Sequence, residues 1–390
     1  MSLRVLTLST LFPDASRPNF GIFVERQTRE LACRPNVEVT VIAPRGIPPW
    51  PLSGTGRYRT LAALPQVEEW RGLSVFRPRF PIIPALGGRF HPANIARAVL
   101  PLANRLHTEK PFDVIDASFF YPDGPAAMRI ARRLAIPFSI KARGADIHHW
   151  ARQRATGPQI TRAANAASGL LAVSAAMRED MIALGIEGDK IRVHYTGVDF
   201  DRFRPAPDRT VAKAALGLSG PVIISTGALI PRKGQDLLIR ALPALPNVTL
   251  LLAGEGSERA GYVRLAKELG VTRRVRLLGS VVHEALPAFV AAADVMALPS
   301  ASEGLANAWI EALACGTPIV ISDAGGAREV VDRAEAGRIV AREPLAIATA
   351  IRDLLSNPPS AESVRDTVRR FSWKANGDAL LAHLSEIAGK

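Results

Sequence analysis

The sequence lacks the features that mark several large classes of protein. Its 390 residues include only two cysteines, Cys33 and Cys315, which are far apart and have neither CxxC spacing nor a histidine neighbour. A disulfide scaffold and a zinc module are therefore excluded, and a reducing cytoplasm suits the chain. No stretch approaches the roughly 18 consecutive apolar residues of a membrane-spanning helix. Residues 1–12 lack a small-residue cleavage site, so they predict a first strand rather than a signal peptide.

Two common nucleotide-binding strings are also missing. No G-x-x-x-x-G-K-[ST] string occurs, which disfavours a P-loop ATPase. The first predicted strand-to-helix turn, NFGIFVE at residues 19–25, lacks the G-x-G-x-x-G pattern, and this argues against an enzyme that uses NAD. The composition, with 48% hydrophobic and 22% charged residues, is that of an ordinary globular protein. Its length predicts two domains.

Acidic residues are scarce relative to basic ones. Lysine and arginine total 49 against 36 aspartates and glutamates, a net charge of +13. Residues 1–200 hold 26 basic and 16 acidic residues, and the remainder holds 23 and 20. This excess in the first half favours an anionic partner there, either phosphate, phospholipid or nucleic acid, although no nucleic-acid motif is present. Arginine-rich codon usage is the alternative explanation, because only eight basic residues are lysines.

The first half begins as a βαβ unit and is then interrupted. Leu3–Thr10 and Val37–Ala43 are predicted strands around a helix at 23–32, which favours a parallel, doubly wound sheet. Residues 44–92 then mix many prolines with aromatic residues and arginines. Such a long section suits a membrane interface or a phosphorylated acceptor, and a surface loop with short strands is an equal alternative. Alternation resumes with strands at 114–117, 138–141, 170–173 and 191–195 and helices at 124–135, 158–167 and 175–184.

The second half alternates regularly, which predicts a second Rossmann-like domain. We expect an N-terminal domain at 1–199, which binds the acceptor, and a C-terminal domain at 200–370, which binds the nucleotide sugar. The tail helix, within 371–390, is expected to pack back onto the first domain. Ligands of such sheets bind at the carboxyl ends of the strands, and the cleft between two lobes is the expected active site. Predicted strands are 222–226, 249–253, 275–278, 294–298 and 319–322, and predicted helices are 234–244, 258–269, 284–292, 306–315, 326–332 and about 374–388.

The segment PSASEGLANAWIEALACGTP, residues 299–318, carries the most chemistry. A predicted strand feeds a loop that contains Glu303, and the following helix carries Asn307 and Glu311 on one face. The unpaired N–H groups at that helix N-terminus suit an anionic diphosphate. Carboxylates at Glu303 and Glu311 can accept hydrogen bonds from the vicinal hydroxyls of sugars. An ordinary surface position is the alternative for Glu311.

Four other turns combine small or charged residues at strand ends. GALIPRKG, residues 227–234, contains Arg232 and Lys233, which can neutralise phosphate, although such a basic turn is more often merely solvated. The turns at 254–256 and 279–281 contain glycines that let a ligand approach the backbone closely. In the first half, NFG at 19–21 and RGAD at 143–146 also follow predicted strands.

The motifs EGLANAWIEALACGTP, GALIPRKG, LLAGEG, LLGSV and TGVDFDRFRP together resemble the family-4 retaining glycosyltransferases of GT-B fold. The resemblance covers nearly the whole chain and is best in the second half, through its Glu-x7-Glu element. FGIFVERQ and RGADI match more loosely. It implies an α/β fold of two facing, doubly wound Rossmann-like domains with a cleft between them. Residues 44–92 resemble the corresponding section of enzymes that build bacterial surface polysaccharides.

The resemblance implies a role for each matched residue. Glu311 binds the nucleotide ribose, Glu303 binds hydroxyls of the donor sugar, and the amides of 305–308 hold the diphosphate and the sugar. Lys233 and Arg232 neutralise the departing diphosphate. Val281 contacts the base through its backbone, and Gly21 lets the first domain approach the donor phosphates. The implied donor-binding residues are Gly21, Gly227, Arg232, Lys233, Gly254, Val281, Glu303, Gly304, Leu305, Ala306, Asn307, Ala308 and Glu311, and the implied catalytic residues are Glu303, Lys233, Arg232, Arg143 and Asp146.

Two positions depart from the family pattern. Ala228 stands where the family often has a phosphate-binding arginine, and Arg232 is expected to substitute for it. Arg143 stands where the family often has histidine, three residues before Asp146. Arginine stays protonated and cannot act as a base, so we name no general base.

Two segments contain residue types that can bind metal ions, but each has a simpler structural interpretation. Asp199-Phe200-Asp201 spells the DxD string of the other glycosyltransferase fold, but it lies inside TGVDFDRFRP, so a structural or donor-adjacent role is favoured. Asp146 with His148 and His149 is more simply a surface loop. We therefore expect no metal and no other cofactor.

The function implied by the resemblance is retaining transfer of a hexosyl group. The donor is a nucleoside diphosphate sugar and the acceptor is a glycan or a lipid-linked molecule, in bacterial cell-surface polysaccharide biosynthesis. A sugar-nucleotide epimerase of the same fold is the alternative. The expected location is the cytoplasm, at the inner face of the membrane, where the basic first domain meets anionic lipid. No nucleic acid partner is expected.

Overall fold

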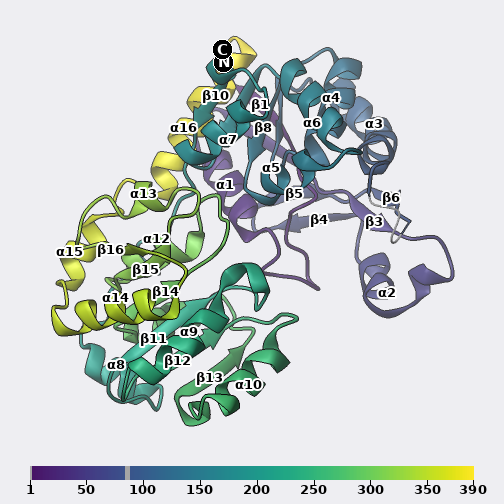
Figure 1. The fold of residues 1–390 in the computed structure, drawn as a ribbon. Helices are drawn as coiled ribbons and strands as arrows, with labels where there is room; N and C mark the ends of the chain where they lie inside the picture. The colour runs from purple at the N-terminus through teal and green to yellow at the C-terminus, as the bar shows by residue number, and fades with distance from the viewer. Residues whose placement is uncertain (1, 84–87) are drawn as a thin grey trace. The chain divides into compact units, whose positions relative to one another are not determined.

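The computed structural model of the protein describes residues 2–83 and 88–390 (Figure 1). The chain folds into two compact units. One comprises Met1–Gly197 together with Trp373–Lys390, and the other comprises Val198–Ser372. In the described ranges, no helix is both long and apolar enough to cross a membrane.

The first unit is built on an eight-stranded sheet. Its strand order is β10-β9-β8-β7-β1-β2-β5-β4, and every neighbouring pair is parallel except the hairpin of β4 and β5. A separate parallel pair, β3 with β6, lies within the section 44–92. The strands are β1 (Leu3–Leu8), β2 (Val37–Ile42), β3 (Arg45–Ile47), β4 (Val67–Trp70), β5 (Leu73–Phe76), β6 (Arg79–Pro81), β7 (Val114–Ala117), β8 (Phe138–Ala142), β9 (Gly169–Ala172) and β10 (Ile191–Val193).

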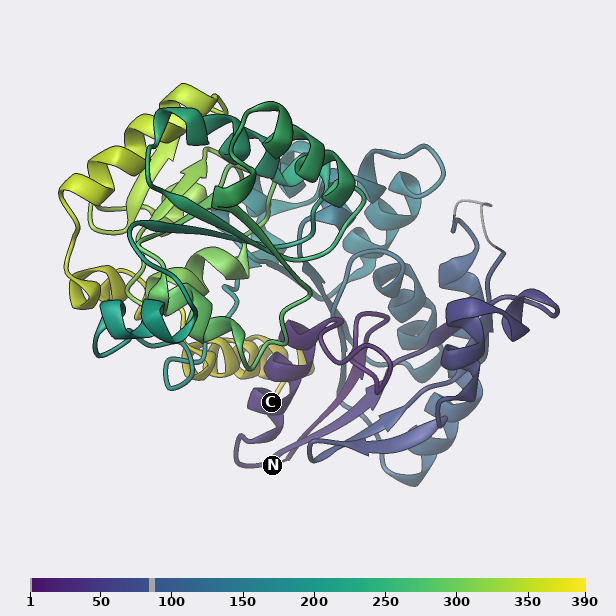
Figure 2. The ribbon, with the colours of Figure 1, turned by 90° about the horizontal axis from the view of Figure 1, so that it is seen from below.

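The C-terminal helix completes this first unit. Helix α16 (Trp373–Ala388) lies along α1 (Ile22–Ala32), as Figures 1 and 2 both show. Leu380 and Leu384 of α16 are fully buried in one apolar cluster with Val5 of β1. Each such buried leucine contributes about 1.5–3 kcal/mol of hydrophobic stabilisation. The other helices of the unit are α2 (Gly56–Ala63), α3 (His91–Glu109), α4 (Asp123–Leu134), α5 (Ala145–His148), α6 (Gly157–Ala166), α7 (Ala175–Ala183) and the 3₁₀ turns η1 (Leu52–Gly54), η2 (Trp150–Arg152) and η3 (Gly188–Lys190).

The second unit contains a six-stranded, wholly parallel sheet in the order β13-β12-β11-β14-β15-β16. The strands are β11 (Val222–Thr226), β12 (Thr249–Ala253), β13 (Val275–Gly279), β14 (Val295–Leu298), β15 (Ile319–Ser322) and β16 (Gly337–Val340). The helices are α8 (Arg209–Ala215), α9 (Gln235–Ala241), α10 (Arg259–Glu268), α11 (Leu286–Ala292), α12 (Asn307–Ala314), α13 (Ala327–Val330), α14 (Pro344–Ser356), α15 (Ala361–Asp366) and the 3₁₀ turns η4 (Pro231–Lys233), η5 (Leu242–Ala244) and η6 (Thr272–Arg274).

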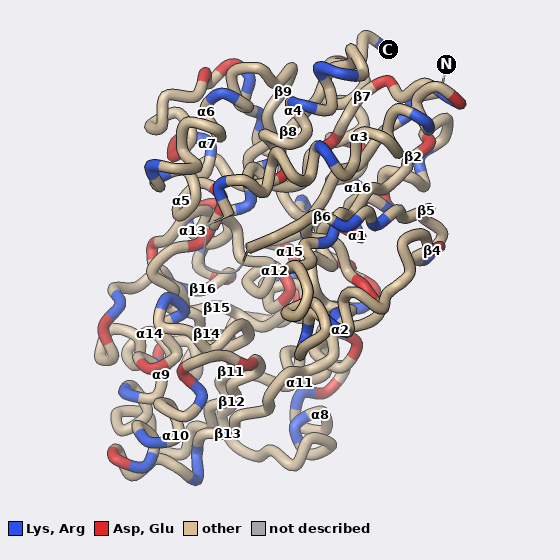
Figure 3. Tube along the Cα trace, turned by 90° about the vertical axis from the view of Figure 1, so that its right-hand side faces the viewer, with Lys and Arg blue, Asp and Glu red and all other residues tan. Residues whose placement is uncertain are grey.

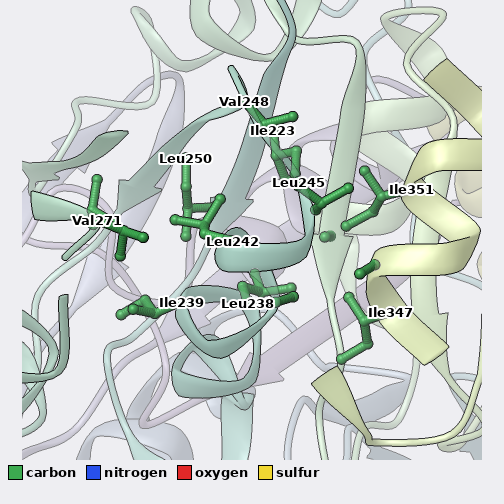
Figure 4. Packing of buried hydrophobic residues seen from close by; sticks show 14 of the residues in the cluster. Ile223, Leu238, Ile239, Leu242, Leu245, Val248, Leu250, Val271, Ile347 and Ile351 are labelled. Carbon is green, nitrogen blue, oxygen red and sulfur yellow. The ribbon is translucent and has the colours of Figure 1, made fainter. Parts of the chain in front are cut away.

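Burial on both faces explains why the central strands are continuous apolar runs. β11, β14 and β15 are buried at every position, as is usual for parallel strands covered by helices on both sides. On one face, Leu238 of α9 and Ile347 of α14 meet Ile223 of β11 in a single cluster (Figure 4). Helices α14 and α15 and strand β16 were not among the predicted elements. The GT-B fold class, with two Rossmann-like domains, agrees with this architecture.

The section 44–92 contains short strands and one helix in its described part. Strands β3–β6 and helix α2 all lie within it, and its side chains are largely half-buried or exposed. The DxD string also has a structural role, because Oδ1 of Asp199 accepts hydrogen bonds from the main-chain N–H groups of Asp201 and Arg202.

Candidate functional site

In the second unit, the loops that follow the parallel strands interlock at one edge of the sheet. The N–H of Leu229 donates to the carbonyl of Glu255, and the N–H of Gly254 donates to that of Gly279. The N–H of Ala301 likewise donates to the carbonyl of Arg232, at 2.7 Å. These main-chain bonds join the loops after β11, β12, β13 and β14 into one surface. The sequence predicted the donor-binding residues of this unit on the same loops and on α12.

Lys233, Arg232 and Glu303 converge within that surface. The ammonium of Lys233 lies 2.5 Å from Oε1 of Glu303, and both side chains are mostly buried. The Arg232 guanidinium lies 3.5 Å from the other carboxylate oxygen and also donates to the carbonyl of Ser302. Arg232 keeps 45% of its side chain exposed. One buried carboxylate therefore holds two cations, one of which still faces solvent.

The glycines at these loops are required by close packing between main chains. A Cβ on Gly254, whose φ is +153°, would lie 1.9 Å from the carbonyl oxygen of Gly227. A Cβ on Gly234 would lie 2.4 Å from the carbonyl oxygen of Pro299. Position 254 therefore requires glycine for structural reasons. The donor contacts predicted for Gly227 and Gly254 stay predictions.

The N-terminus of α12 follows directly after Glu303 and Gly304. Ala306 precedes the helix, and no side chain caps it. Among the described residues, none accepts a hydrogen bond from the main-chain N–H groups of Leu305, Ala306, Asn307 or Ala308. Gly304 is held in place because its carbonyl accepts from the N–H of Gly326 at 2.8 Å. Four adjacent amides at the positive end of a helix form an anion-binding arrangement.

Glu311 lies one turn into α12, and its neighbour is a residue that the sequence reasoning missed. Nε2 of His283 lies 3.8 Å from Oε1 of Glu311, with both side chains mostly buried. The ring of His283 also packs against Phe203, with 5.4 Å between ring centroids. The half-buried Val281 lies two residues before His283. A histidine two residues after the turn 279–281 was the signal that could have identified this neighbour.

Glu311 also influences the thiol of Cys315, one helical turn further on. Burial, with a smaller contribution from the Glu311 carboxylate, raises the pKa of Cys315 well above its ordinary value. This thiol is buried, whereas Cys33 is exposed. Cys315 is therefore an inert part of the core and not a nucleophile.

In the first unit, Gly21 lies at the N-terminus of α1 with φ +69°. A Cβ there would lie 2.4 Å from the carbonyl oxygen of Leu11, so the loop after β1 itself requires glycine. The predicted role of Gly21, close approach to the donor phosphates, stays a prediction.

Arg143 follows β8 and is held on three sides. Its Nε donates to the carbonyl of Ser118 at 2.7 Å, and one terminal nitrogen donates to Oε1 of Gln27 at 3.3 Å. The guanidinium lies 4.8 Å from the centroid of the Phe23 ring. Burial lowers the pKa of Arg143 to about 10, with Asp116 and Asp146 opposing that effect. The side chain thus carries a fixed positive charge at neutral pH.

Asp146 has a positioning role in this structure. Its fully buried carboxylate accepts hydrogen bonds from the main-chain N–H groups of Phe120, Arg143 and Gly144, at 2.8–3.1 Å. Burial raises the pKa of Asp146, and these N–H groups oppose that effect. The carboxylate closes the loop that carries Arg143 and so positions that residue. The predicted catalytic role of Asp146 stays a prediction.

A buried polar network lies behind Arg143. The ammonium of Lys141 lies 2.9 Å from Oε1 of Gln27, the atom that Arg143 also contacts, and 2.8 Å from Nδ1 of His194. Burial lowers the pKa values of Lys141 and His194 well below their ordinary values. Burial also raises the pKa of Asp116 to about 6. The sequence reasoning missed this network, although a lysine inside the apolar strand FSIKA was a signal for it.

The first unit also contains a pocket of about 620 Å³ lined by aromatic side chains. Part of its wall comes from the section 44–92, including Tyr58 and Phe80. The rest comes from the loops after β1, β7 and β8, including Tyr121 and Trp150, whose ring centroids are 5.2 Å apart. We call this the aromatic pocket. Its lining aromatic residues are Phe20, Tyr58, Phe80, Phe119, Tyr121 and Trp150.

In the second suggested metal site, His148 and Asp146 are bound to other residues of the protein. Nε2 of His148 lies 2.8 Å from the carboxylate of Asp180, and the oxygens of Asp146 are occupied by main-chain N–H groups. Within residues 2–83 and 88–390, no group of three or more metal-ligating side chains is placed to hold an ion.

Comparison with known proteins matches both units. Residues 208–371 match the glycosyl transferases group 1, and residues 21–202 match Glycosyltransferase Family 4. A GDP-mannose-dependent alpha-(1-6)-phosphatidylinositol monomannoside mannosyltransferase of Mycolicibacterium smegmatis is 38% identical over 208 residues, which are 48% of this chain and 54% of the relative. A D-inositol 3-phosphate glycosyltransferase of Mycobacterium leprae is 39% identical over 214 residues, 51% of this chain and 50% of the relative. The chain thus spans about half the length of these curated relatives.

Solved structures share the fold over the whole chain. Anabaena HepE in complex with UDP matches with a TM-score of 0.76 at 23% identity, covering 98% of this chain and all of that one. Sucrose-phosphate synthase of Thermosynechococcus elongatus matches with a TM-score of 0.81 at 21% identity, covering 99% of each.

The family models assign the chain to the glycosyltransferases. The solved structures show that its fold is GT-B. The chain belongs to the family-4 glycosyltransferases, as its motifs predicted. The alternative of a sugar-nucleotide epimerase finds no support in these comparisons.

Proposed function

We propose that this enzyme moves a hexosyl group from a nucleoside diphosphate sugar to a glycan or lipid-linked acceptor, with retention of anomeric configuration. The observation that carries this proposal is the convergence of Lys233 and Arg232 on Glu303, directly before the uncapped N-terminus of α12. Cations and oriented amides are the groups that stabilise a departing diphosphate.

Each part of this arrangement has a proposed task. The amides of 305–308 bind the diphosphate, and Glu303 accepts hydrogen bonds from hydroxyls of the donor sugar. Glu311, which lies beside His283, binds the ribose hydroxyls. As the bond between the anomeric carbon and the diphosphate breaks, negative charge grows on the leaving oxygen beside Lys233 and Arg232. These fixed charges stabilise that transition state, and we propose that no metal is required.

The acceptor proton is proposed to leave with the phosphate. Arg143 cannot remove a proton, because its pKa of about 10 keeps it charged at neutral pH. In a front-face reaction the departing phosphate oxygen takes the proton of the acceptor hydroxyl as the new glycosidic bond forms. Arg143 would then contribute only positive charge toward the phosphate, and its network with Gln27 holds it in place.

The acceptor is proposed to bind the first unit, in the aromatic pocket. Aromatic faces pack against the apolar faces of sugar rings and against lipid chains, and the pocket offers several of them. The name of the M. smegmatis relative specifies a glycosylated phospholipid as its acceptor, which supports a lipid-linked or glycan acceptor here. Bacterial cell-surface polysaccharide biosynthesis is the proposed setting.

Contact with the inner face of the membrane is also proposed. In the section 44–92, Trp50 is 84% exposed, and Leu52, Ile83 and Phe90 are also exposed. Arginines 57, 59 and 89 lie in the same section and are exposed. Exposed aromatic and aliphatic side chains beside arginines suit the surface of an anionic bilayer.

Thermal unfolding with nucleoside diphosphates tests the donor site. Purified enzyme is measured with UDP, GDP, ADP and NAD, and GDP comes first because the M. smegmatis relative uses GDP-mannose. A ligand at 100 times its dissociation constant stabilises the folded state by about 2.7 kcal/mol. We expect a shift with one diphosphate, and loss of that shift in Glu311→Ala.

A transfer assay with the matching hexose donor then tests the reaction itself. The anomeric configuration of the product, determined by NMR, tests retention, and activity in EDTA tests the metal-free proposal. If none of the three nucleoside diphosphates shifts the unfolding temperature, or if NAD alone does, the proposed donor site is overturned.

A further inference from the structure

The face formed by α4, η2 and α6 in the first unit has an unusual charge balance. Residues 124–178 contain nine lysines and arginines but one acidic residue, Asp146. Asp146 is fully buried, and its oxygens are occupied by main-chain N–H groups. Of the nine basic residues, Lys141 and Arg143 belong to the buried network, and Arg178 pairs with Glu179. No carboxylate from this stretch offsets the other six, and Figure 3 marks basic residues of α4 and α6 in blue along the chain trace.

Four of these arginines surround one open pocket of about 800 Å³, which we call the arginine pocket. Arg132 comes from α4, Arg152 from η2, Arg162 from α6, and Arg154 from the turn between the last two. All four are exposed. Within the part of the chain that the structure describes, none of them has an ion pair or a hydrogen-bond partner.

Several other arginines of the same unit are held in ion pairs. Arg34, for example, is paired with Glu30 and Asp378, and Arg77 with Glu68. Four unpaired guanidinium groups around one depression repel each other, and an oxoanion would relieve that repulsion. Guanidinium groups bind carboxylate and phosphate in a bidentate manner, which makes such groups the natural occupants.

The rest of the lining is polar or small. Asn165, Gln153 and Thr161 contribute amide and hydroxyl groups that suit sugar hydroxyls. None of the exposed large hydrophobic residues of the described chain lies within 124–178. An open depression lined by polar and small residues, without large apolar anchors, favours a discrete polar ligand over a lipid surface.

Neighbouring residues of η2 line the arginine pocket and the aromatic pocket. Trp150 of η2 lines the aromatic pocket, and the next two residues, Ala151 and Arg152, line the arginine pocket. A chain of sugars that lies against Trp150 therefore has an arginine-lined site beside it.

We propose that the acceptor is an anionic glycan, and that the arginine pocket binds one of its carboxylate or phosphate groups while a neighbouring sugar occupies the aromatic pocket. This inference rests on the proposed glycosyl transfer and specifies the class of its acceptor. The arginine pocket selects the charged acceptor and leaves donor binding untouched.

Direct binding to two probes tests the proposal. The probes are a fluorescent oligogalacturonate of about ten sugars, which carries carboxylates, and a phosphorylated dextran, each beside neutral dextran at low salt. The variant Arg132→Gln/Arg162→Gln removes two pocket charges. Its matched control, Arg264→Gln/Arg273→Gln, removes two exposed arginines of the second unit that also have no described partner. Nucleoside diphosphate binding is measured on all three proteins.

We expect at least one anionic probe to bind the wild type, and the pocket variant to weaken that binding by roughly tenfold or more. The control should change it less than twofold, and neutral dextran should bind equally weakly to all three proteins. The probe that binds identifies the oxoanion as carboxylate or phosphate. In transfer assays the pocket variant should raise KM for the charged acceptor and keep kcat.

Several results would overturn the proposal. These are no binding of either anionic probe, an equal loss in the control variant, or a pocket variant that instead loses binding to vesicles of phosphatidylglycerol and phosphatidylcholine. Failure of the proposed transferase activity is distinguishable, because it would appear as absent nucleotide binding in the wild type while glycan binding persisted.

Discussion

The ammonium group of Lys233 lies 2.5 Å from Oε1 of Glu303, and the two residues come from loops 70 positions apart in the sequence. The loop after β11 brings the lysine and the loop after β14 brings the carboxylate. A hydrogen bond from the N–H of Ala301 to the carbonyl of Arg232 holds the two loops together. The cation is thus fixed before any donor binds, and pre-organisation of this kind makes charged groups effective in catalysis.

Removing this cation should impair the chemical step. We expect Lys233→Ala to lower kcat by about 10²–10³, the usual cost of losing one preorganised group that stabilises transition-state charge. Glu303 would keep Arg232 as a partner, so the fold should survive. Steady-state transfer kinetics measure the effect. Lys267→Ala, at an exposed position of α10, is the control, and equal loss in both variants would contradict the assignment.

His283 should act on donor binding through Glu311. Its Nε2 lies 3.8 Å from the Glu311 carboxylate, so we expect His283→Ala to free that side chain and raise KM for the donor by roughly tenfold, about 1.4 kcal/mol, while kcat changes little. Glu284→Gln, which alters the exposed neighbour paired with Arg202 instead, should leave KM unchanged. A fall in kcat at constant KM would contradict this reading.

The second unit could be predicted from sequence because its signals are local. The strands 222–226, 249–253 and 319–322 coincide with β11, β12 and β15, since continuous apolar runs between turns are typical of buried parallel strands. The loops carrying Lys233 and Glu303 followed from the ends of the predicted strands 222–226 and 294–298. Strand β16 escaped prediction because it contains an arginine and is only half-buried. Helix α14 was also missed.

The first unit was harder because its site depends on contacts between distant residues. Lys141, Gln27 and His194 are brought together by β8, α1 and the segment after β10, and no spacing in the sequence reveals that meeting. The main-chain contacts of Asp146 could not be predicted for the same reason. Its motif suggested chemistry, whereas main-chain N–H groups from two loops occupy its oxygens.

Gly254 should be intolerant of any side chain. Gly254→Ala would place a Cβ 1.9 Å from the Gly227 carbonyl oxygen, so the loop must move, and we expect a loss of more than about 2 kcal/mol in unfolding free energy. Gly270→Ala is the matched control, since φ is +69° there but no atom lies within 4 Å. It should cost about 1 kcal/mol. Urea denaturation measures both, and similar losses would show that the clash does not matter.

The attachment of the C-terminal helix should depend on pH through His383. This α16 residue is buried and contacts Oγ of Ser139 at 2.8 Å. Burial lowers the pKa of His383 from 6.5 to about 4; Arg192 and Lys141 also lower it, and Glu386 opposes them. Between those two pH values the unfolded chain binds a proton that the folded chain does not. Stability from this group is therefore complete above pH 6.5 and is lost as the pH falls toward 4.

The sign and size of this effect can be isolated with one variant. From pH 7.5 to pH 5, the wild type should lose about 2 kcal/mol more unfolding free energy than His383→Gln, whose amide can still bond to Ser139 but does not titrate. Because the raised pKa values of Asp116 and Asp123 act in the opposite direction in both proteins, the difference between the two proteins reports His383 alone. Urea denaturation of each protein at the two pH values provides the measurement. Parallel pH profiles would mean that His383 titrates normally in the folded protein, and that its burial against Ser139 does not couple the attachment of α16 to pH.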